Sequence, residues 1–215
     1  MKKVGRTMPE KNQGNENRFK RLITISPRTT GFIDPGTKCL GFCVLRSRNE
    51  NNTLKNSILN FGRVMTTGKD LHCKVSHITT NIIAVMESAG CKMVYIEHPP
   101  YTVYEQESSN KDLVVARAIS ICKLMALVYH LTGTMESKGI EVRHILPVQW
   151  QVHHSKRGGL DTKTWAVNYS NIIVSKQPKI YAEKGKLLSD HNVAEAVSMA
   201  DIMTRKLYNG VYHEQ

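Results

Sequence analysis

The chain has 215 residues, of which 40% are hydrophobic, and its formal net charge is +12 with an isoelectric point near 9.5. This length and apolar content allow one substantial core, and no Gly-, Ser- or Pro-rich linker divides the chain, so a single domain is expected. No apolar run approaches the length of a membrane span, which argues against a membrane protein. The positive charge predicts an anionic partner, with nucleic acid as the first candidate and a merely soluble basic protein as the plainer alternative.

Residues 1–26 are polar and basic with few apolar side chains, so they are expected to form a disordered arm ahead of a domain covering residues 27–215. The segment lacks the apolar core of a secretory signal, and its acidic residues argue against a mitochondrial transit peptide. We therefore expect a cytoplasmic protein, with a mitochondrial location left open. The five cysteines form no Cys-x-x-Cys pair and are interpreted as small core residues in a reducing compartment.

An acidic turn separates the first two apolar runs of the domain. Phe32–Ile33 before the turn and Phe42–Leu45 after it are predicted to be two strands of a hairpin, which places Asp34 at a strand end near the middle of a sheet. Burial of an unpaired carboxylate costs roughly several kcal/mol, so Asp34 needs a metal ion, a cationic partner or exposure. A turn residue that bonds only to local backbone is the simpler interpretation.

The remaining elements alternate between strands and helices. Their hydrophobic spacing predicts a strand over 57–64, a helix over about 74–89, a strand over 93–97, a helix over about 110–131 with Leu113 among its inward residues, a strand over 142–146, a loop over 153–159, a helix over about 162–174 capped by Asp161, and a last helix capped by Ser189 or Asp190. Three antiparallel strands followed by helix-strand-helix-strand-helix predict an α/β fold with a mixed five-stranded sheet and helices on both faces.

Three acids are placed where they could act together. Glu97 closes a short buried strand as Asp34 does, and Glu195 lies one turn into the last helix among apolar neighbours. Hydrolysis of a phosphodiester by two metal ions needs about four such ligands from different elements. Oxygen ligands favour magnesium, or manganese, over zinc. Taken alone, Glu97 could also be a solvated strand end, which is the plainer interpretation.

The fourth ligand is less clear. His191 and Asn192 share a helix face with Glu195, whereas Asp190 could join only from the capping position. An acid at a helix start is also favoured by capping and the helix dipole without any metal. Asp201, further along the same helix, is expected to be an ordinary surface residue.

Several motifs in order resemble the RuvC family of Holliday junction resolvases. They are Ile33-Asp34-Pro35-Gly36 with the later Gly41, Tyr95-Ile96-Glu97, the segment from Leu146-Pro147-Val148-Gln149-Trp150 through Gly158-Gly159-Leu160-Asp161 to Lys163, and a last helix that opens on an acid. The resemblance spans about Phe32 to Met203 and leaves out the amino-terminal arm.

The resemblance implies an RNase H-like fold, a homodimer, and magnesium-dependent nicking of two opposed strands in a four-way DNA junction. On this basis Asp34, Glu97 and Glu195 match three of the family's four metal ligands, and Lys163 matches its active-site lysine, which can stabilise charge on the attacked phosphate. The family usually has an acid, sometimes histidine, three residues before the last ligand, where this chain has Asn192. We favour Asp190 as the replacement, with His191 or Asn192 as alternatives.

DNA contact is expected from a second group of residues. Basic side chains would bind phosphates, and two aromatic rings in the loop after Glu97 would stack on unpaired bases or simply pack; the residues are Lys156, Arg157, Lys163, Lys111, Tyr101 and Tyr104. The same acids could instead serve a flap or branched-DNA nuclease, or a junction-binding protein with a weakened site. An actin-like phosphotransferase shares the Asp-x-Gly-Thr pattern, but the chain shows no second copy of that fold.

Overall fold

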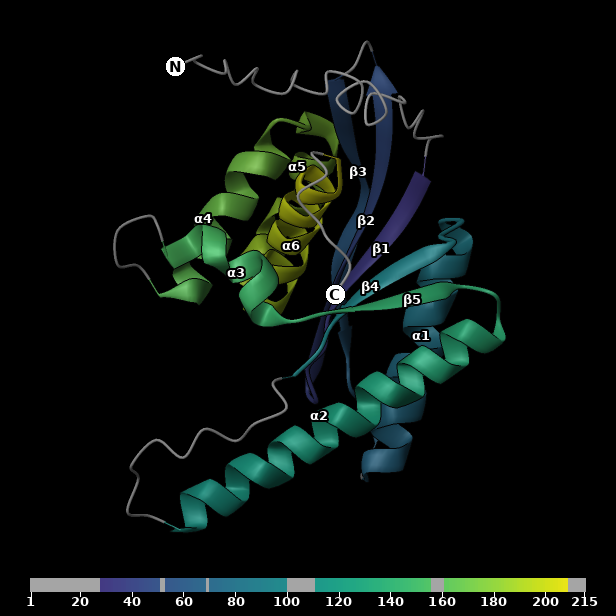
Figure 1. Ribbon diagram of the computed structural model, residues 1–215, viewed down its shortest axis with the longest axis vertical. Coiled ribbons are helices and arrows are strands. Elements are labelled where there is room, and N and C mark those ends of the chain that lie inside the picture. The colour runs from purple at the N-terminus through teal and green to yellow at the C-terminus, as the bar shows by residue number, and fades with distance from the viewer. Residues whose placement is uncertain (1–27, 51–52, 69, 100–110, 156–160, 209–215) are drawn as a thin grey trace, which may run out of the picture.

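The computed structural model describes residues 28–50, 53–68, 70–99, 111–155 and 161–208. Its centre is a five-stranded sheet of order β3-β2-β1-β4-β5 (Figure 1). The strands β1, β2 and β3 are antiparallel, and β4 and β5 run parallel to β1; they span Arg28–Asp34, Cys39–Glu50, Thr53–Met65, Met93–Glu97 and Glu141–Ile145. The predicted mixed sheet, with three antiparallel strands followed by two parallel ones, is confirmed.

The alternation of side chains along the strands divides the interior into two cores, one on each face of the sheet. Phe32, Cys43, Phe61 and Tyr95 contribute to one core. Their chain neighbours contribute to the other; among these are Ile33, Phe42, Val44, Val94 and Ile96. Because both faces of the central strands are covered, these strands consist of nearly continuous apolar residues.

Helices cover both faces, as predicted. The first face is covered by α3 (Pro147–Ser155), α4 (Thr162–Ser175), α5 (Pro178–Lys184), the 3-10 turn η1 (Gly185–Ser189) and α6 (His191–Tyr208). The opposite face is covered by α1 (Leu71–Ser88) and by α2 (Lys111–Ser137). The α4 prediction is confirmed, including its cap, because the Asp161 carboxylate accepts hydrogen bonds from the backbone N–H groups of Lys163 and Thr164.

Several boundaries differ from the sequence prediction, and two short elements were not predicted. The loop expected from residue 153 begins later, because residues 153–155 complete α3. Helix α1 begins three residues before the expected start, because the Asp70 side chain caps it by accepting from the Cys73 N–H. Neither α5 nor η1 was predicted, since both are too short to give a clear apolar period.

The long helix α2 is apolar on more than its core-facing side. Leu113, Val115 and Ile119 are 43%, 56% and 49% exposed, so the inward prediction for Leu113 is wrong, and packing against the sheet comes from the second half of the helix, at Leu127, Val128, Leu131 and Met135. By length and composition this helix could cross a membrane, which corrects the expectation that no run approaches that length. A single such helix is weak evidence for a membrane span, even though only 11% of its most apolar window is buried.

The cysteines agree only in part with their interpretation as core residues. Cys43 and Cys91 are buried, Cys39 is half-buried, and Cys73 and Cys122 are exposed. All five are free thiols, as expected for a chain without a disulfide framework. The predicted disordered arm over residues 1–26 lies outside the described residues.

Candidate active site

Two of the predicted acids lie side by side at the ends of parallel strands. Ile33 of β1 pairs with Ile96 of β4, so the next residues, Asp34 and Glu97, are neighbours at the same edge of the sheet. Successive side chains of a strand point to opposite faces of the sheet. Ile33 and Ile96 point into the core beneath α1 and α2, so both carboxyl groups point to the face that α6 covers. Asp34 is only 7% exposed, and its side chain bonds to Glu195 of α6, so the structure contradicts the interpretation of Asp34 as a turn residue that bonds only to local backbone.

Helix α6 brings the third acid to this pair. The side chains of Asp34 and Glu195 share a hydrogen bond. Burial, followed by the charges of Glu97 and Glu195, raises the pKa of Asp34 well above its ordinary value. Burial also raises the pKa of Glu97 to about 7 and that of Glu195 in the same direction. The three acids therefore form one electrostatic unit in which ionisation of each opposes that of the others.

A buried tryptophan holds Glu97 in place. The Trp150 indole N–H donates to Glu97 Oε2, and this bond partly offsets the effect of burial on the Glu97 pKa. Trp150 is fully buried on α3. The sequence analysis named Trp150 as part of a motif but did not identify it as a site residue. The signals that could have found it are its N–H donor and its position shortly after a strand end.

The residues around the expected fourth position have other partners. The Asn192 amide donates to the backbone carbonyl of Cys39 on β2. Asp190 Oδ1 accepts from the Asn192 backbone N–H at 3.1 Å, and its Oδ2 accepts from Arg63 Nη1 at 2.8 Å. The Cys39 thiol also points at Oδ2, at 3.8 Å, and burial, then the Asp190 charge, raises the pKa of this thiol to about 11. Sequence analysis did not identify Arg63 or Cys39.

Two basic side chains lie near Glu195. Lys163 is the second residue of α4, close to the Asp161 cap. Its charge lowers the pKa of Glu195, whereas burial raises it. The charge of the exposed His191 acts in the same direction. The structure thus brings Lys163 and three acids from β1, β4 and α6 to one edge of the sheet.

The acids suit a divalent cation by their chemistry. In the part of the chain that the structure describes, no group of three or more His, Cys, Asp or Glu side chains already has the arrangement of metal ligands; Asp34 and Glu195 bond to each other instead. All three acids offer oxygen, which magnesium and manganese prefer. A cation would also relieve the mutual repulsion that raises the pKa of Asp34.

Comparisons with known proteins give a fold. No family model matches the chain, and no curated protein matches it. Among solved structures, RuvC of T. thermophilus in complex with Holliday junction substrate aligns with a TM-score of 0.53 at 16% identity, over 85% of this chain and 96% of that chain. The chain has the RuvC fold. A Fowlpox virus resolvase bound to Holliday junction DNA aligns with a TM-score of 0.48 at 11% identity, over 82% of this chain and 98% of that one.

The RuvC fold confirms the expected RNase H-like arrangement of the sheet. The predicted DNA-binding residues remain predictions. Lys156, Arg157, Tyr101 and Tyr104 lie outside the described residues, and Lys111 is described only as the first residue of α2.

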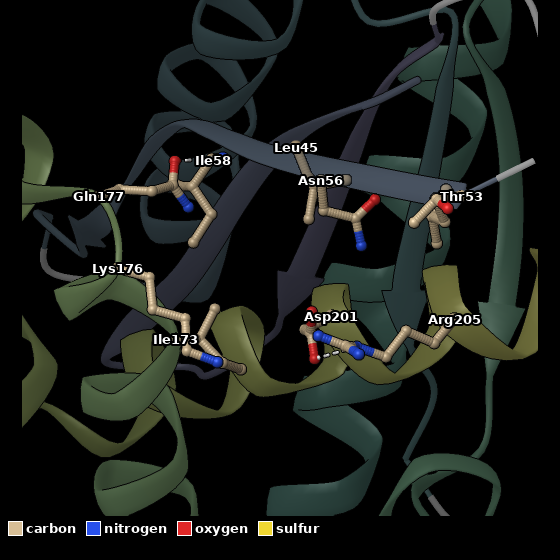
Figure 2. Close-up of a pocket in the computed structure, with 10 residues that line it drawn as sticks. Leu45, Thr53, Asn56, Ile58, Ile173, Lys176, Gln177, Asp201 and Arg205 are labelled. Carbon is tan, nitrogen blue, oxygen red and sulfur yellow. Dashed lines mark hydrogen bonds and ion pairs between the residues drawn. The ribbon is translucent and has the colours of Figure 1, made fainter. Parts of the chain in front are cut away.

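A separate hollow on the RuvC fold lies away from the acids. A pocket of about 430 Å³ lies between β2, β3, α4 and α6, and Figure 2 shows residues that line it. None of the candidate site residues lines it. Asp201 lines this pocket, is only 2% exposed and accepts from Arg205 and from the Tyr169 hydroxyl, both at 2.8 Å. The expectation that Asp201 is an ordinary surface residue is therefore wrong, because its helix face packs against α4 and the sheet.

Proposed function

We propose that this protein is a structure-selective endodeoxyribonuclease that resolves four-way DNA junctions by metal-dependent phosphodiester hydrolysis. The main support is the convergence of Asp34, Glu97 and Glu195 from three separate elements on one buried edge of the sheet. The net charge of +12 suits a polyanionic substrate. RuvC of T. thermophilus, whose fold this chain shares, is described with a Holliday junction bound.

Each residue near the acids has a proposed role. Asp34, Glu97 and Glu195 would hold magnesium, for which manganese could substitute, and the bound metal would supply a Lewis acid and an activated water at the phosphate. The buried Trp150 N–H keeps the Glu97 carboxylate in one orientation. Lys163, which faces Glu195, would stabilise charge that develops on the attacked phosphate.

A homodimer accounts for the exposed half of α2. Symmetric cutting of two opposed strands needs two active sites, and most soluble oligomers form closed symmetric assemblies. Val115 and Ile119 lie four residues apart on one face of this helix and are exposed apolar side chains, which a second copy would cover. Such an enzyme would act in DNA recombination and repair, or on branched replicated DNA, in the cytoplasm of a prokaryotic host or an infected cell.

One observation favours a second candidate. Asn192 stands where an acid is usual, and its amide is bonded to Cys39, which supports a junction-binding protein with a weakened metal site. That protein would bind four-way junctions tightly but would not cut them at any magnesium or manganese concentration. A flap nuclease would instead prefer flaps to four-way junctions under the same conditions.

The test compares a synthetic four-way junction, a flap and a plain duplex, with and without magnesium. We expect symmetric nicks in the four-way junction when magnesium is present, and no nicks in the flap or the plain duplex. Asp34→Asn and Glu97→Gln should abolish cutting and spare junction binding, because each removes a metal ligand but leaves the basic surface. The matched control is Glu87→Gln. Glu87 is an exposed acid on α1 that pairs with Lys138, and this variant should cut junctions normally. Normal cutting by Asp34→Asn or Glu97→Gln would refute the assignment.

A further inference from the structure

Arg63 lies on the same face of the sheet as the candidate site. Asp34 of β1 pairs with Gly41 of β2, and Gly41 pairs with Arg63 of β3, so the three residues form one row across three strands. Directly paired residues of antiparallel strands point to the same face. With strands about 4.8 Å apart, the Arg63 Cα lies roughly 10 Å from that of Asp34. A cation therefore stands within reach of any phosphate bound at the acids.

The glycine in the middle of this row lets α6 begin between Asp34 and Arg63. A Cβ at Gly41 would lie 2.0 Å from the Asn192 carbonyl oxygen, so the helix start rests directly on the β2 backbone. From there the helix presents Glu195 to Asp34 on one side and Asp190 to Arg63 on the other. Glu195 of α6 and Asp190, which caps this helix, thus serve different parts of the surface.

Both carboxylate oxygens of Asp190 are already engaged. Oδ1 caps its own helix, and Oδ2 accepts from Arg63 at 2.8 Å and from the Cys39 thiol. A metal ion at Oδ2 would compete with the guanidinium for the same oxygen, because two cations close together repel each other.

Arg63 keeps capacity for a second partner. Its bond to Asp190 uses Nη1, whereas a guanidinium has five N–H donors in a fork that matches phosphate oxygens. Its side chain is 46% exposed, compared with 19% for Asp190. The less exposed acid therefore fixes the direction of an accessible cation, which is the arrangement expected of a phosphate contact and its support.

We propose that Asp190 is a positioning residue that holds Arg63 against a DNA phosphate beside the active site, and that it is not the fourth metal ligand. This inference rests on the proposed nuclease function. It leaves Asp34, Glu97 and Glu195 as the acids that bind metal, and it makes Arg63 a substrate contact on the strand β3.

The first test measures manganese binding to the DNA-free protein by electron paramagnetic resonance. Asp190→Asn should keep the number of bound ions and change their affinity by less than about twofold, whereas Glu97→Gln should lose at least tenfold, as expected for a ligand. Loss of an ion, or a tenfold weaker affinity, in Asp190→Asn would overturn the proposal. This readout does not depend on cleavage.

The second test measures junction affinity in EDTA as a function of salt. Arg63→Gln should reduce the slope of log affinity against log salt by about 1, the value for one lost phosphate contact, and Arg63→Lys should largely restore it. Lys55→Gln is the matched control. Lys55 is an exposed cation of the same strand, β3, and its Nζ pairs with Glu50 Oε2 at 2.7 Å; this ion pair lies away from the site. An unchanged slope in Arg63→Gln would overturn the proposal.

A double-mutant cycle links the two residues. Asp190→Asn should slow single-turnover cutting in the wild-type background and have no further effect in the Arg63→Gln background, because it acts through Arg63. If the double variant instead slows cutting by the product of the two single effects, Asp190 acts independently of Arg63 and the inference is overturned. If the wild-type protein cuts junctions but any of these results fails, the inference alone is wrong; if the wild type cuts nothing, the proposed function falls with it.

Discussion

Replacement of Glu97 by glutamine should stabilise the metal-free protein at neutral and alkaline pH. The pKa of Glu97 rises from the ordinary 4.5 to about 7, mainly through burial. Between these two values the unfolded chain has released the proton while the folded chain retains it, so stability falls by roughly 1.4 kcal/mol per pH unit. Above pH 7, ionisation of the buried Glu97 therefore lowers the free energy of unfolding by about 3 kcal/mol in total. Glutamine removes this loss, and its amide oxygen can still accept from Trp150.

The assay is thermal unfolding in EDTA from pH 4.5 to pH 8.5. For a chain of this length, 3 kcal/mol corresponds to a rise of roughly 6–12 °C in Tm at pH 8. The rise should shrink to nearly zero at pH 4.5, where Glu97 of the folded wild type is protonated and therefore as neutral as glutamine. The control Glu87→Gln changes an exposed ion pair and should shift stability by about 0.5 kcal/mol or less. Equal or lower stability of Glu97→Gln at pH 8 would refute the reasoning.

Three further predictions concern the dimer, the helix junction and the lysine. Val115→Asp with Ile119→Asp, which charges the exposed patch of α2, should give a monomer in sedimentation analysis; an unchanged dimer would place the interface elsewhere. Gly41→Ala should lower stability toward urea by about 1–3 kcal/mol, because its Cβ would meet a backbone carbonyl at 2.0 Å, whereas Gly133→Ala meets nothing within 4 Å and should not destabilise. Lys163→Ala should slow cutting by roughly a hundredfold with a smaller loss of junction affinity; full activity would exclude a role at the phosphate.

The sheet and its two strand-end acids could be predicted from sequence because both depend on local patterns. Short apolar runs that end in Asp34 and Glu97 define buried strands, and a parallel crossover between them brings their ends to one edge. The helical period and the acid among apolar neighbours likewise identified Glu195 as a residue that faces the protein. These features need no knowledge of distant contacts.

The surroundings of the site could not be predicted, because they depend on register between segments far apart in sequence. Arg63 reaches Asp190 across 127 positions, and Asn192 reaches Cys39 across 153. The absence of a side chain at Gly41 matters only once α6 rests on it. Short elements were missed for a different reason, since α5 and η1 have seven and five residues and give little periodicity.

The most direct test of the central claim is a crystal structure of the wild-type protein soaked in manganese, with anomalous scattering used to locate the metal. The account predicts one or more manganese peaks about 2.0–2.3 Å from carboxyl oxygens of Asp34, Glu97 and Glu195, with the hydrogen bond between Asp34 and Glu195 broken. An intact bond between these two acids, with manganese bound elsewhere or not at all, would contradict it.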